Sequence, residues 1–161
     1  YTGMILSTRE SPKCRARVIH YGISQISGGS KTSVGGYADD EPEDESSAQF
    51  DVSDTRTLDQ VVRWLMESGY IPSFCTACYR EGRTGDRFMS LCKSGQIQYV
   101  CQPNAIMTLK EYLNDYASEG TRQTGEALIQ REIGNISKPK IREIVMQNLA
   151  RIDEGSRDFR L

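Results

Sequence analysis

Cysteine is the residue type in this chain best suited to bind a metal, and three of the five cysteines are spaced for that purpose. Cys75 and Cys78 are separated by two residues, so a tight turn brings both sulfur atoms towards one metal, and 22 residues separate Cys78 from Cys101. Thiolates are soft ligands, which select zinc, copper(I) or iron–sulfur clusters. An odd number of cysteines with a close pair at its centre fits a metal site in a reducing compartment better than a set of disulfides.

The close pair also has other interpretations. Buried thiols can act as small hydrophobic side chains without any ligand. A thioredoxin-like redox pair opens a helix after a strand, whereas Cys78 leads into the loop-like run 79–85. A structural zinc site needs four ligands, but Cys92 lies in the helical-looking run 86–93, where we expect it to face the core, and the only histidine is His20. Three thiolates without an evident fourth ligand suit an iron–sulfur cluster with one open iron.

Basic residues lie close to these cysteines in the sequence. Arg80 and Arg83 could stabilise an anionic cluster or bind a carboxylate ligand. For Arg87 and Lys93 we expect a solvated position instead.

The elements that must position this chemistry begin with a βαβ pattern. The apolar run 3–8 predicts a buried strand, Ser11-Pro12 predicts the start of a helix that ends at Gly22, and 23–27 predicts a second strand before a glycine-rich loop. Two parallel strands cannot form a stable sheet alone. We therefore expect residues 1–37 to belong to a larger α/β body.

The rest of the chain predicts a charged linker and then helices. The run 39–45 contains six acidic residues around a proline, so we expect 38–48 to be a solvated linker or loop. Capping boxes start predicted helices at Thr57 and at Thr108, and Ser137 with Pro139 predicts the start of a third helix.

The composition is that of an ordinary globular domain. The chain has 161 residues, of which 37% are hydrophobic and 26% charged, and a net charge of −2 gives no electrostatic reason to expect a nucleic acid. No apolar run approaches the roughly 20 residues of a membrane-spanning helix. The sequence starts at Tyr1 rather than Met, and we expect it to be the last part of a longer protein.

Several short runs of the sequence, taken together and in this order, form a pattern typical of a protein family. They are Ser7-Thr8-Arg9-Glu10, Ser24-Gln25-Ile26-Ser27-Gly28-Gly29-Ser30, Gly35-Gly36-Tyr37, Cys75-Thr76-Ala77-Cys78-Tyr79-Arg80, Gly82-Arg83-Thr84-Gly85, Cys101-Gln102-Pro103-Asn104-Ala105 and Leu109-Lys110-Glu111-Tyr112-Leu113. With them, nearly the whole chain resembles the C-terminal part of the radical-SAM tyrosine lyases of [FeFe]-hydrogenase maturation, which are 2-iminoacetate synthase-like and carry a biotin and thiamin synthesis associated domain. The first and third runs are shared with the thiamine-pathway tyrosine lyases, whereas the C-x2-C-x22-C pattern is typical of the maturases.

The resemblance implies a fold class and an activity for the whole enzyme. The expected fold is α/β, with residues 1–37 as the last strands of a radical-SAM (β/α)8 barrel, 38–48 as the acidic linker or loop, and 49–161 as a mainly helical auxiliary-cluster domain. The enzyme is expected to cleave L-tyrosine to p-cresol and dehydroglycine through a radical made from S-adenosylmethionine at a [4Fe-4S] cluster. Dehydroglycine is then expected to yield CO and cyanide for the hydrogenase H-cluster.

The resemblance also implies site residues. Cys75, Cys78 and Cys101 match the ligands of an auxiliary [4Fe-4S] cluster, whose open iron is expected to carry a further iron and a cysteine. Arg9, at the end of a barrel strand, is expected to bind the tyrosine carboxylate, and Ser27, at the end of the next strand, to hydrogen-bond to the same group. The alternatives are a salt bridge of Arg9, to its sequence neighbour or elsewhere, and a loop-capping role for Ser27. The chain has no C-x3-C-x2-C motif, so the SAM-binding cluster is expected in a part of the enzyme that precedes this chain.

Two other functions stay open at this point. A thiamine-pathway tyrosine lyase (2-iminoacetate synthase) would leave the auxiliary cysteines unexplained. A non-catalytic zinc- or cluster-binding module is disfavoured because residues 1–37 would be unstable alone. The expected partners are L-tyrosine, S-adenosylmethionine, L-cysteine and other hydrogenase maturation proteins, with neither a nucleic acid nor a membrane. The expected location is the cytoplasm, or an organelle in a eukaryote.

Overall fold

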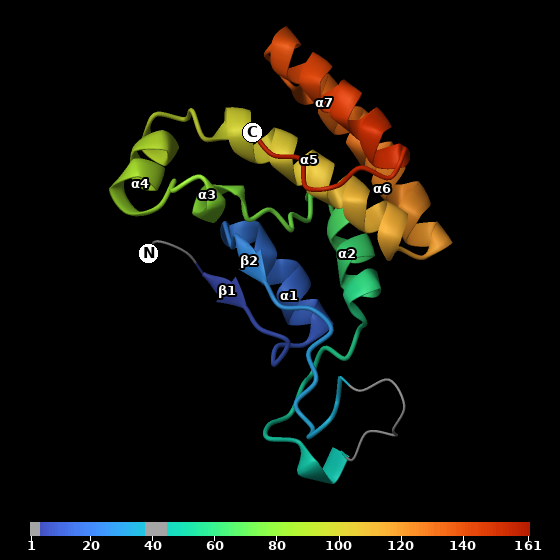
Figure 1. Cartoon of the computed structure of the whole chain (residues 1–161). Helices are drawn as coiled ribbons and strands as arrows, with labels where there is room; N and C mark the ends of the chain where they lie inside the picture. The colour runs from blue at the N-terminus through green and yellow to red at the C-terminus, as the bar shows by residue number, and fades with distance from the viewer. Residues whose placement is uncertain (1–3, 38–44) are drawn as a thin grey trace. The chain divides into compact units, whose positions relative to one another are not determined.

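A computed structural model describes residues 4–37 and 45–161 of the chain (Figure 1). The chain divides into two compact units, Tyr1–Val61 and Val62–Leu161. Most of the acidic run lies outside the described residues, so the linker expected at 38–48 stays a prediction. The structure describes 45–48 of this range, where Glu45–Ser47 form the 3₁₀ helix η2.

The first unit contains the βαβ pattern that the sequence predicts. Strand β1 (Ile5–Leu6) pairs in parallel with β2 (Gln25–Ile26), and the connection between them contains helix α1 (Pro12–Val18) and the 3₁₀ helix η1 (Ile19–Tyr21). Ser11 caps α1, because its hydroxyl oxygen accepts a hydrogen bond from the Cys14 amide at 3.3 Å. Gly22, with φ of 89°, ends the helical segment as expected.

The strands are shorter than expected, and the prediction that the first one is buried is only half right. Leu6 is 5% exposed, whereas Ile5 is 68% exposed. Successive side chains of a strand point to opposite faces. Leu6 therefore packs into the first unit, while Ile5 lies on the face of the two-stranded sheet that the described residues leave open.

Helix α2 (Leu58–Glu67) begins at the predicted capping box. The Thr57 amide donates to Gln60 Oε1 at 2.9 Å, and the Gln60 amide donates to Thr57 Oγ1 at 3.2 Å. This reciprocal pair satisfies two backbone donors that the first turn would otherwise leave unpaired. Gly69, with φ of 85°, follows the end of the helix.

The second unit is helical. Its remaining helices are α3 (Ala77–Arg80), α4 (Gly85–Lys93), α5 (Gln98–Asp115), α6 (Glu119–Asn135) and α7 (Pro139–Asp153). Figure 1 shows α5, α6 and α7 packed together. Their facing residues form the core, which includes Ile106, Met107, Leu113, Ile129 and Val145. Pro139 is the first residue of α7, as the sequence predicts.

The helix start predicted at Thr108 is wrong. Helix α5 begins ten residues earlier, at Gln98, and runs through this position. The Thr108 hydroxyl donates to the backbone oxygens of Asn104 at 3.0 Å and Ala105 at 3.3 Å, so it bonds backwards within the helix instead of capping it. Pro103 lies inside α5 without ending it.

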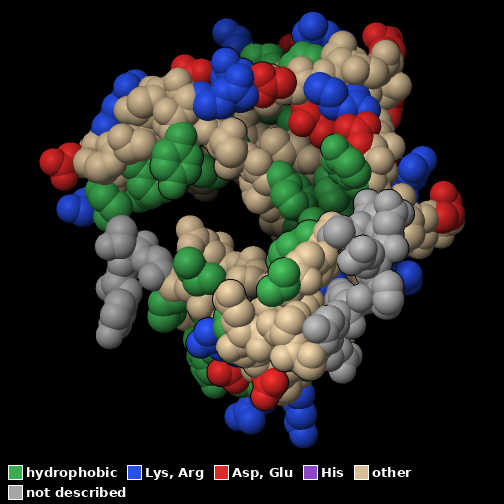
Figure 2. Space-filling model, turned by 60° about the horizontal axis from the view of Figure 1, so that its bottom comes forward, with side chains coloured by type: hydrophobic (Ala, Val, Ile, Leu, Met, Phe, Trp, Pro, Cys, Tyr) green, Lys and Arg blue, Asp and Glu red, His purple; other side chains and the backbone are tan. Residues whose placement is uncertain are grey.

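On the face drawn in Figure 2, basic and acidic side chains lie interspersed. Within the described part of the chain, none of the helices has the length and apolar character needed to cross a membrane.

Candidate functional site

The close cysteine pair lies at the start of a one-turn helix in the second unit. Cys75 immediately precedes Thr76, the N-cap residue of α3, and Cys78 is the second residue of this helix. The loop predicted immediately after the pair is therefore wrong for residues 79 and 80, which complete the turn. Residues 70–76 have no regular structure, so the strand that precedes a thioredoxin-like pair is not found in this described segment.

Backbone hydrogen bonds shape the turn around both cysteines. The Ala77 amide donates to Cys75 Sγ at 3.4 Å. The Arg83 amide donates to the backbone oxygen of Cys78 at 2.8 Å and closes the loop behind the helix. These two bonds hold the backbone around the cysteine pair in a defined turn.

The third predicted ligand lies in the first turn of helix α5. The Cys101 amide donates to the Ile97 backbone oxygen at 2.8 Å, which starts the helical ladder. Cys101 is exposed, yet its thiol is partly desolvated, which raises its pKa, and the charges of Cys78, Cys75 and, more weakly, Cys92 raise this pKa further. The four cysteines of the second unit therefore lie within electrostatic reach of one another around Cys101.

Cys92 does not face the core as the sequence suggested. It lies on α4, which has no buried residue, and its side chain is half-buried. Among residues 4–37 and 45–161, no group of three His, Cys, Asp or Glu side chains is placed to hold a metal ion.

Three of the basic residues near the cysteines have partners on the protein. Arg80 forms two hydrogen bonds with the Asp158 carboxylate, and Arg83 Nη2 donates to the Leu161 backbone oxygen at 2.7 Å. Arg87 Nη1 reaches the backbone oxygens of Glu81 and Gly82 at 3.4 and 3.5 Å. Arg83 also lowers the pKa of Cys101, although more weakly than the other groups raise it.

A second candidate site lies in the first unit, where β1 and β2 end. Parallel strands end at the same edge of a sheet, and Arg9 and Ser27 follow these two ends. The Arg9 guanidinium lies over the Phe50 ring, 4.0 Å from its centroid. The Ser27 amide donates to the Leu6 backbone oxygen at 3.0 Å, which extends the strand pairing by one residue.

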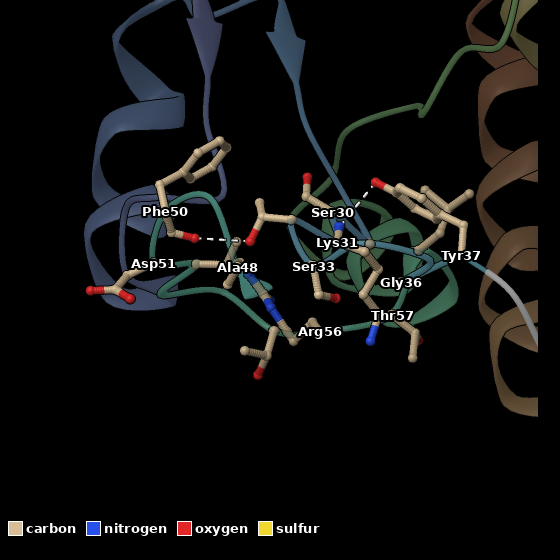
Figure 3. Close-up of a pocket in the computed structure, with 15 residues that line it drawn as sticks. Ser30, Lys31, Ser33, Gly36, Tyr37, Ala48, Phe50, Asp51, Arg56 and Thr57 are labelled. Atoms are coloured by element: carbon tan, nitrogen blue, oxygen red, sulfur yellow. Dashed lines mark hydrogen bonds between the residues drawn. The ribbon is translucent and has the colours of Figure 1, made fainter. Parts of the chain in front are cut away.

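Phe50 also lines an open cavity of about 1010 Å³. Figure 3 shows the glycine-rich loop and the segment 48–58 around this cavity, with the Arg56 side chain extended between them. The Lys31 amide donates to the Tyr37 hydroxyl at 2.9 Å, and the Thr32 hydroxyl donates to the Phe50 backbone oxygen at 2.9 Å. These two bonds hold the cavity wall in a defined shape.

A buried ion pair that the sequence did not indicate holds the two strand ends. Arg15 on α1 is fully buried, and its guanidinium donates to the Asp54 carboxylate and to the Ser27 backbone oxygen. Asp54 itself is 1% exposed, and its amide donates to the Thr8 backbone oxygen at 2.9 Å. Arg56 donates to the same carboxylate through Nε at 2.8 Å and Nη2 at 2.6 Å.

The pKa values of this network follow from its burial and its charges. Burial by itself raises the pKa of Asp54, but the hydrogen bonds and charges of Arg56 and Arg15 together lower it below its usual value. Burial lowers the pKa of Arg15, and Asp54 opposes that effect. The pair therefore stays ionised because each charge has the other as its partner.

Part of the chain matches a known domain family. Residues 1–71 match the model of the Biotin and Thiamin Synthesis associated domain. The chain is 48% identical over 67 residues to the 2-iminoacetate synthases of Salmonella typhimurium and Escherichia coli, which is 42% of this chain and 17% of either relative.

The whole chain matches a solved structure. The match is to the crystal structure of HydG, a maturase of the [FeFe]-hydrogenase, with a TM-score of 0.91 and 53% sequence identity. It covers 100% of this chain and 34% of the maturase chain. The chain thus spans about a third of that structure, and the resemblance predicted from the short sequence runs is confirmed.

Proposed function

Because the chain is similar over its whole length to a maturase of the [FeFe]-hydrogenase, we propose that it is the C-terminal portion of a radical-SAM tyrosine lyase of hydrogenase maturation. The complete enzyme would use S-adenosylmethionine and its cluster to cleave L-tyrosine to p-cresol and dehydroglycine. Dehydroglycine would then supply CO and cyanide for the H-cluster, with L-cysteine and other maturation proteins as further partners.

The extent of the structural match is the observation that carries this proposal. The domain family shared with the thiamine-pathway enzymes accounts for residues 1–71. The match to the maturase covers all of the chain, and so includes the segments that carry Cys75, Cys78 and Cys101. A shared N-terminal part together with a cysteine-bearing C-terminal part favours the maturase over the 2-iminoacetate synthase of the thiamine pathway.

The chemistry of the cysteines fits an auxiliary [4Fe-4S] cluster. A zinc–sulfur bond is about 2.3 Å long, so thiolates that share one zinc ion lie within about 4 Å of each other. A cluster of four irons holds its thiolate ligands farther apart than this, and the charges of Cys78 and Cys75 act on the Cys101 thiol. We assign Cys75, Cys78 and Cys101 as its ligands. When bound with only three of them, such a cluster supplies an open iron for a further ligand.

The protein contributes position and charge to this site. The Ala77 amide holds Cys75 Sγ, and the Arg83 charge acts on the thiol of Cys101. Cys101 lies in the first turn of an 18-residue helix, where the backbone N–H groups favour negative charge. Arg83 and these N–H groups would offset part of the effects that raise the pKa of the Cys101 thiol.

We propose the strand-end site of the first unit as the place where tyrosine is held. Arg9 would bind its carboxylate in a two-bond contact, with Ser27 as a hydrogen-bonding partner. Both residues follow the ends of parallel strands, where barrel enzymes place their substrate-binding groups. The exposure of Ile5 and Met4, at 68% and 42%, supports further barrel strands against this sheet in the complete enzyme.

The cluster can be tested on the chain itself by anaerobic reconstitution with iron and sulfide. We expect an EPR signal of a reduced [4Fe-4S] cluster in the wild type that changes when L-cysteine is added. The signal should be lost in Cys75→Ser, Cys78→Ser and Cys101→Ser, because each variant removes one of only three ligands.

Two cysteines serve as matched controls. Cys92→Ser should keep the signal although Cys92 lies near Cys101, and Cys14→Ser should keep it because Cys14 belongs to the first unit. Loss of the signal in Cys92→Ser would show that Cys92 is a fourth ligand. The cluster would then have four cysteine ligands and no open iron. One bound zinc and no cluster in the folded wild type would support the zinc-module alternative and contradict the maturase function.

A further inference from the structure

The last four residues of the chain, 158–161, run along helix α5 and contact both parts of the cysteine site (Figure 1). On one side they contact the loop that follows Cys78. Arg80 forms its two hydrogen bonds with Asp158, and Arg160 Nε donates to Glu81 Oε1 at 2.9 Å. The loop carrying the close cysteine pair is therefore tied to residues about 78 positions later in the sequence.

On the other side the same four residues contact the helix that carries Cys101. The Leu161 amide donates to Asn104 Oδ1 at 2.8 Å, and Asn104 Nδ2 donates to the Leu161 backbone oxygen at 3.3 Å. Asn104 is 1% exposed and lies three residues after Cys101. Arg83 donates to the same Leu161 oxygen at 2.7 Å, so one backbone atom joins the cysteine loop to α5.

The conformation of the segment is defined by its packing. Asp158 has φ of 69°, a conformation uncommon outside glycine, and persists there because its amide donates to Glu111 Oε1 at 2.8 Å while its carboxylate binds Arg80. Phe159 and Leu161 pack against the core of the helical unit. The segment is thus anchored by apolar contacts as well as by its ion pairs.

We propose that residues 158–161 are a positioning element of the cysteine site, which holds the loop of Cys75 and Cys78 in place against the helix of Cys101 before any metal group is bound. The proposal rests on the proposed function in one respect, since it takes these cysteines as ligands. The contacts themselves involve only protein groups. They can therefore be tested in the metal-free protein, independently of the cluster.

The decisive variant is Asp158→Asn, compared with Asp115→Asn. Asn tolerates the same backbone conformation as Asp, so the first change removes only the carboxylate charge, which binds Arg80 and also accepts a hydrogen bond from Arg160 Nη1 at 3.2 Å. Asp115 forms a similar two-bond pair with Arg157, at 2.9 and 2.5 Å, but at the opposite end of α5 from Cys101. The two variants thus remove the same kind of ion pair from the same C-terminal region. Only the ion pair of Asp158 contacts the cysteine loop.

The first measurement uses the reduced, metal-free chain. Hydrogen exchange would follow the amides of Glu81 and Arg83, which bond to the Ala77 and Cys78 oxygens, and alkylation rates would follow the thiols of the close pair. We expect both rates to rise roughly twofold to fivefold in Asp158→Asn, which is the range for a solvent-exposed ion pair, and to stay unchanged in Asp115→Asn. A chain lacking 158–161 should show roughly tenfold or greater increases, because it also leaves the buried Asn104 amide unpaired. Unchanged exchange of the α6 and α7 amides would show that each variant is folded.

The second measurement is iron retention and the EPR signal after reconstitution. Asp158→Asn should lose iron faster on dilution than Asp115→Asn, while the reduced cluster keeps the spectrum of the wild type, because the ligands are the same. Wild-type exchange and alkylation rates in Asp158→Asn and in the shortened chain would overturn the inference, whatever the cluster does. If the wild type takes up no cluster, the proposed function fails, and the metal-free rates still decide whether this segment positions the thiols.

Discussion

The buried ion pair of the first unit leads to a prediction whose size can be worked from the structure. Asp54→Asn keeps the shape of the side chain and removes its charge. The side chain of Arg15 is 0% exposed and would then lie opposite a neutral amide, although it would keep its bond to the Ser27 oxygen. Arg56, whose side chain is 25% exposed, can turn to solvent and loses little.

Breaking a buried pair by removing one partner costs about 3–5 kcal/mol. We expect the lower end, about 3 kcal/mol, because the new amide oxygen can still accept one hydrogen bond from Arg15. For a domain of this size that corresponds to a fall in melting temperature of roughly 12–24 °C for the first unit. Asp51→Asn, three residues earlier on an exposed side chain, should change stability by no more than about 0.5 kcal/mol.

Hydrogen exchange is the appropriate assay, because the only tryptophan, Trp64, belongs to the second unit and does not report on the first. The amides of Ser53 and Asp54 both donate to the Thr8 oxygen, at 3.0 and 2.9 Å. In Asp54→Asn they should exchange on the order of a hundredfold faster than in the wild type. Equal exchange in Asp54→Asn and Asp51→Asn would refute the reasoning, because it would show that the buried charge of Arg15 does not need its partner.

Two further predictions concern pH and packing. The pKa of Asp54 in the folded chain is lowered, so its stabilising contribution is complete above its unfolded pKa of about 4 and is lost as the pH falls through the lower folded value. The stability difference between wild type and Asp54→Asn, measured by exchange at several pH values, should therefore shrink below pH 4 and stay constant above it; a difference that grows in acid would contradict the assigned direction. Gly125→Ala places a methyl group against Leu113 Cδ1, on a side chain that is 0% exposed, and should destabilise the helical unit by about 1–3 kcal/mol. Gly134→Ala on the same helix meets no atom within 4 Å and should stabilise it by up to about 1 kcal/mol, so equal urea midpoints by Trp64 fluorescence would argue against the packing seen at Gly125.

The sequence predicted the parts of the fold that depend on neighbouring residues. The capping box at Thr57 and Gln60 forms as expected, because both partners lie within one helical turn. The same reasoning failed at Thr108, where a capping-box pattern of the same type lies inside a helix that packing against α6 and α7 stabilises. A local pattern states which bonds a residue can form, and the tertiary contacts decide which of them it does form.

The candidate site shows the same difference between what the sequence indicates and what only the tertiary contacts show. Cys75, Cys78 and Cys101 could be proposed as ligands from residue type and spacing, because metal binding requires a particular chemistry. The residues that hold the strand ends and the cysteine loop have ordinary types, and their partners are 39 residues away for Arg15 and 78 residues away for Arg80. No periodicity or motif connects positions at such separations, so the positioning contacts could be found only in the folded chain.

The arginines of the chain show why this distinction matters for function. Arg9 and Arg15 are six residues apart, and the sequence places Arg9 after a predicted strand but gives no sign that Arg15 pairs with Asp54. The fold separates them by burial, since Arg15 is fully enclosed with Asp54 while Arg9 is exposed over an aromatic ring beside the cavity. A guanidinium whose charge is already balanced inside the protein cannot also bind a substrate carboxylate without losing that partner. The assignment of Arg9 to tyrosine therefore depends on Arg15 as well, because Arg15 fixes the two strand ends between which the carboxylate would be held.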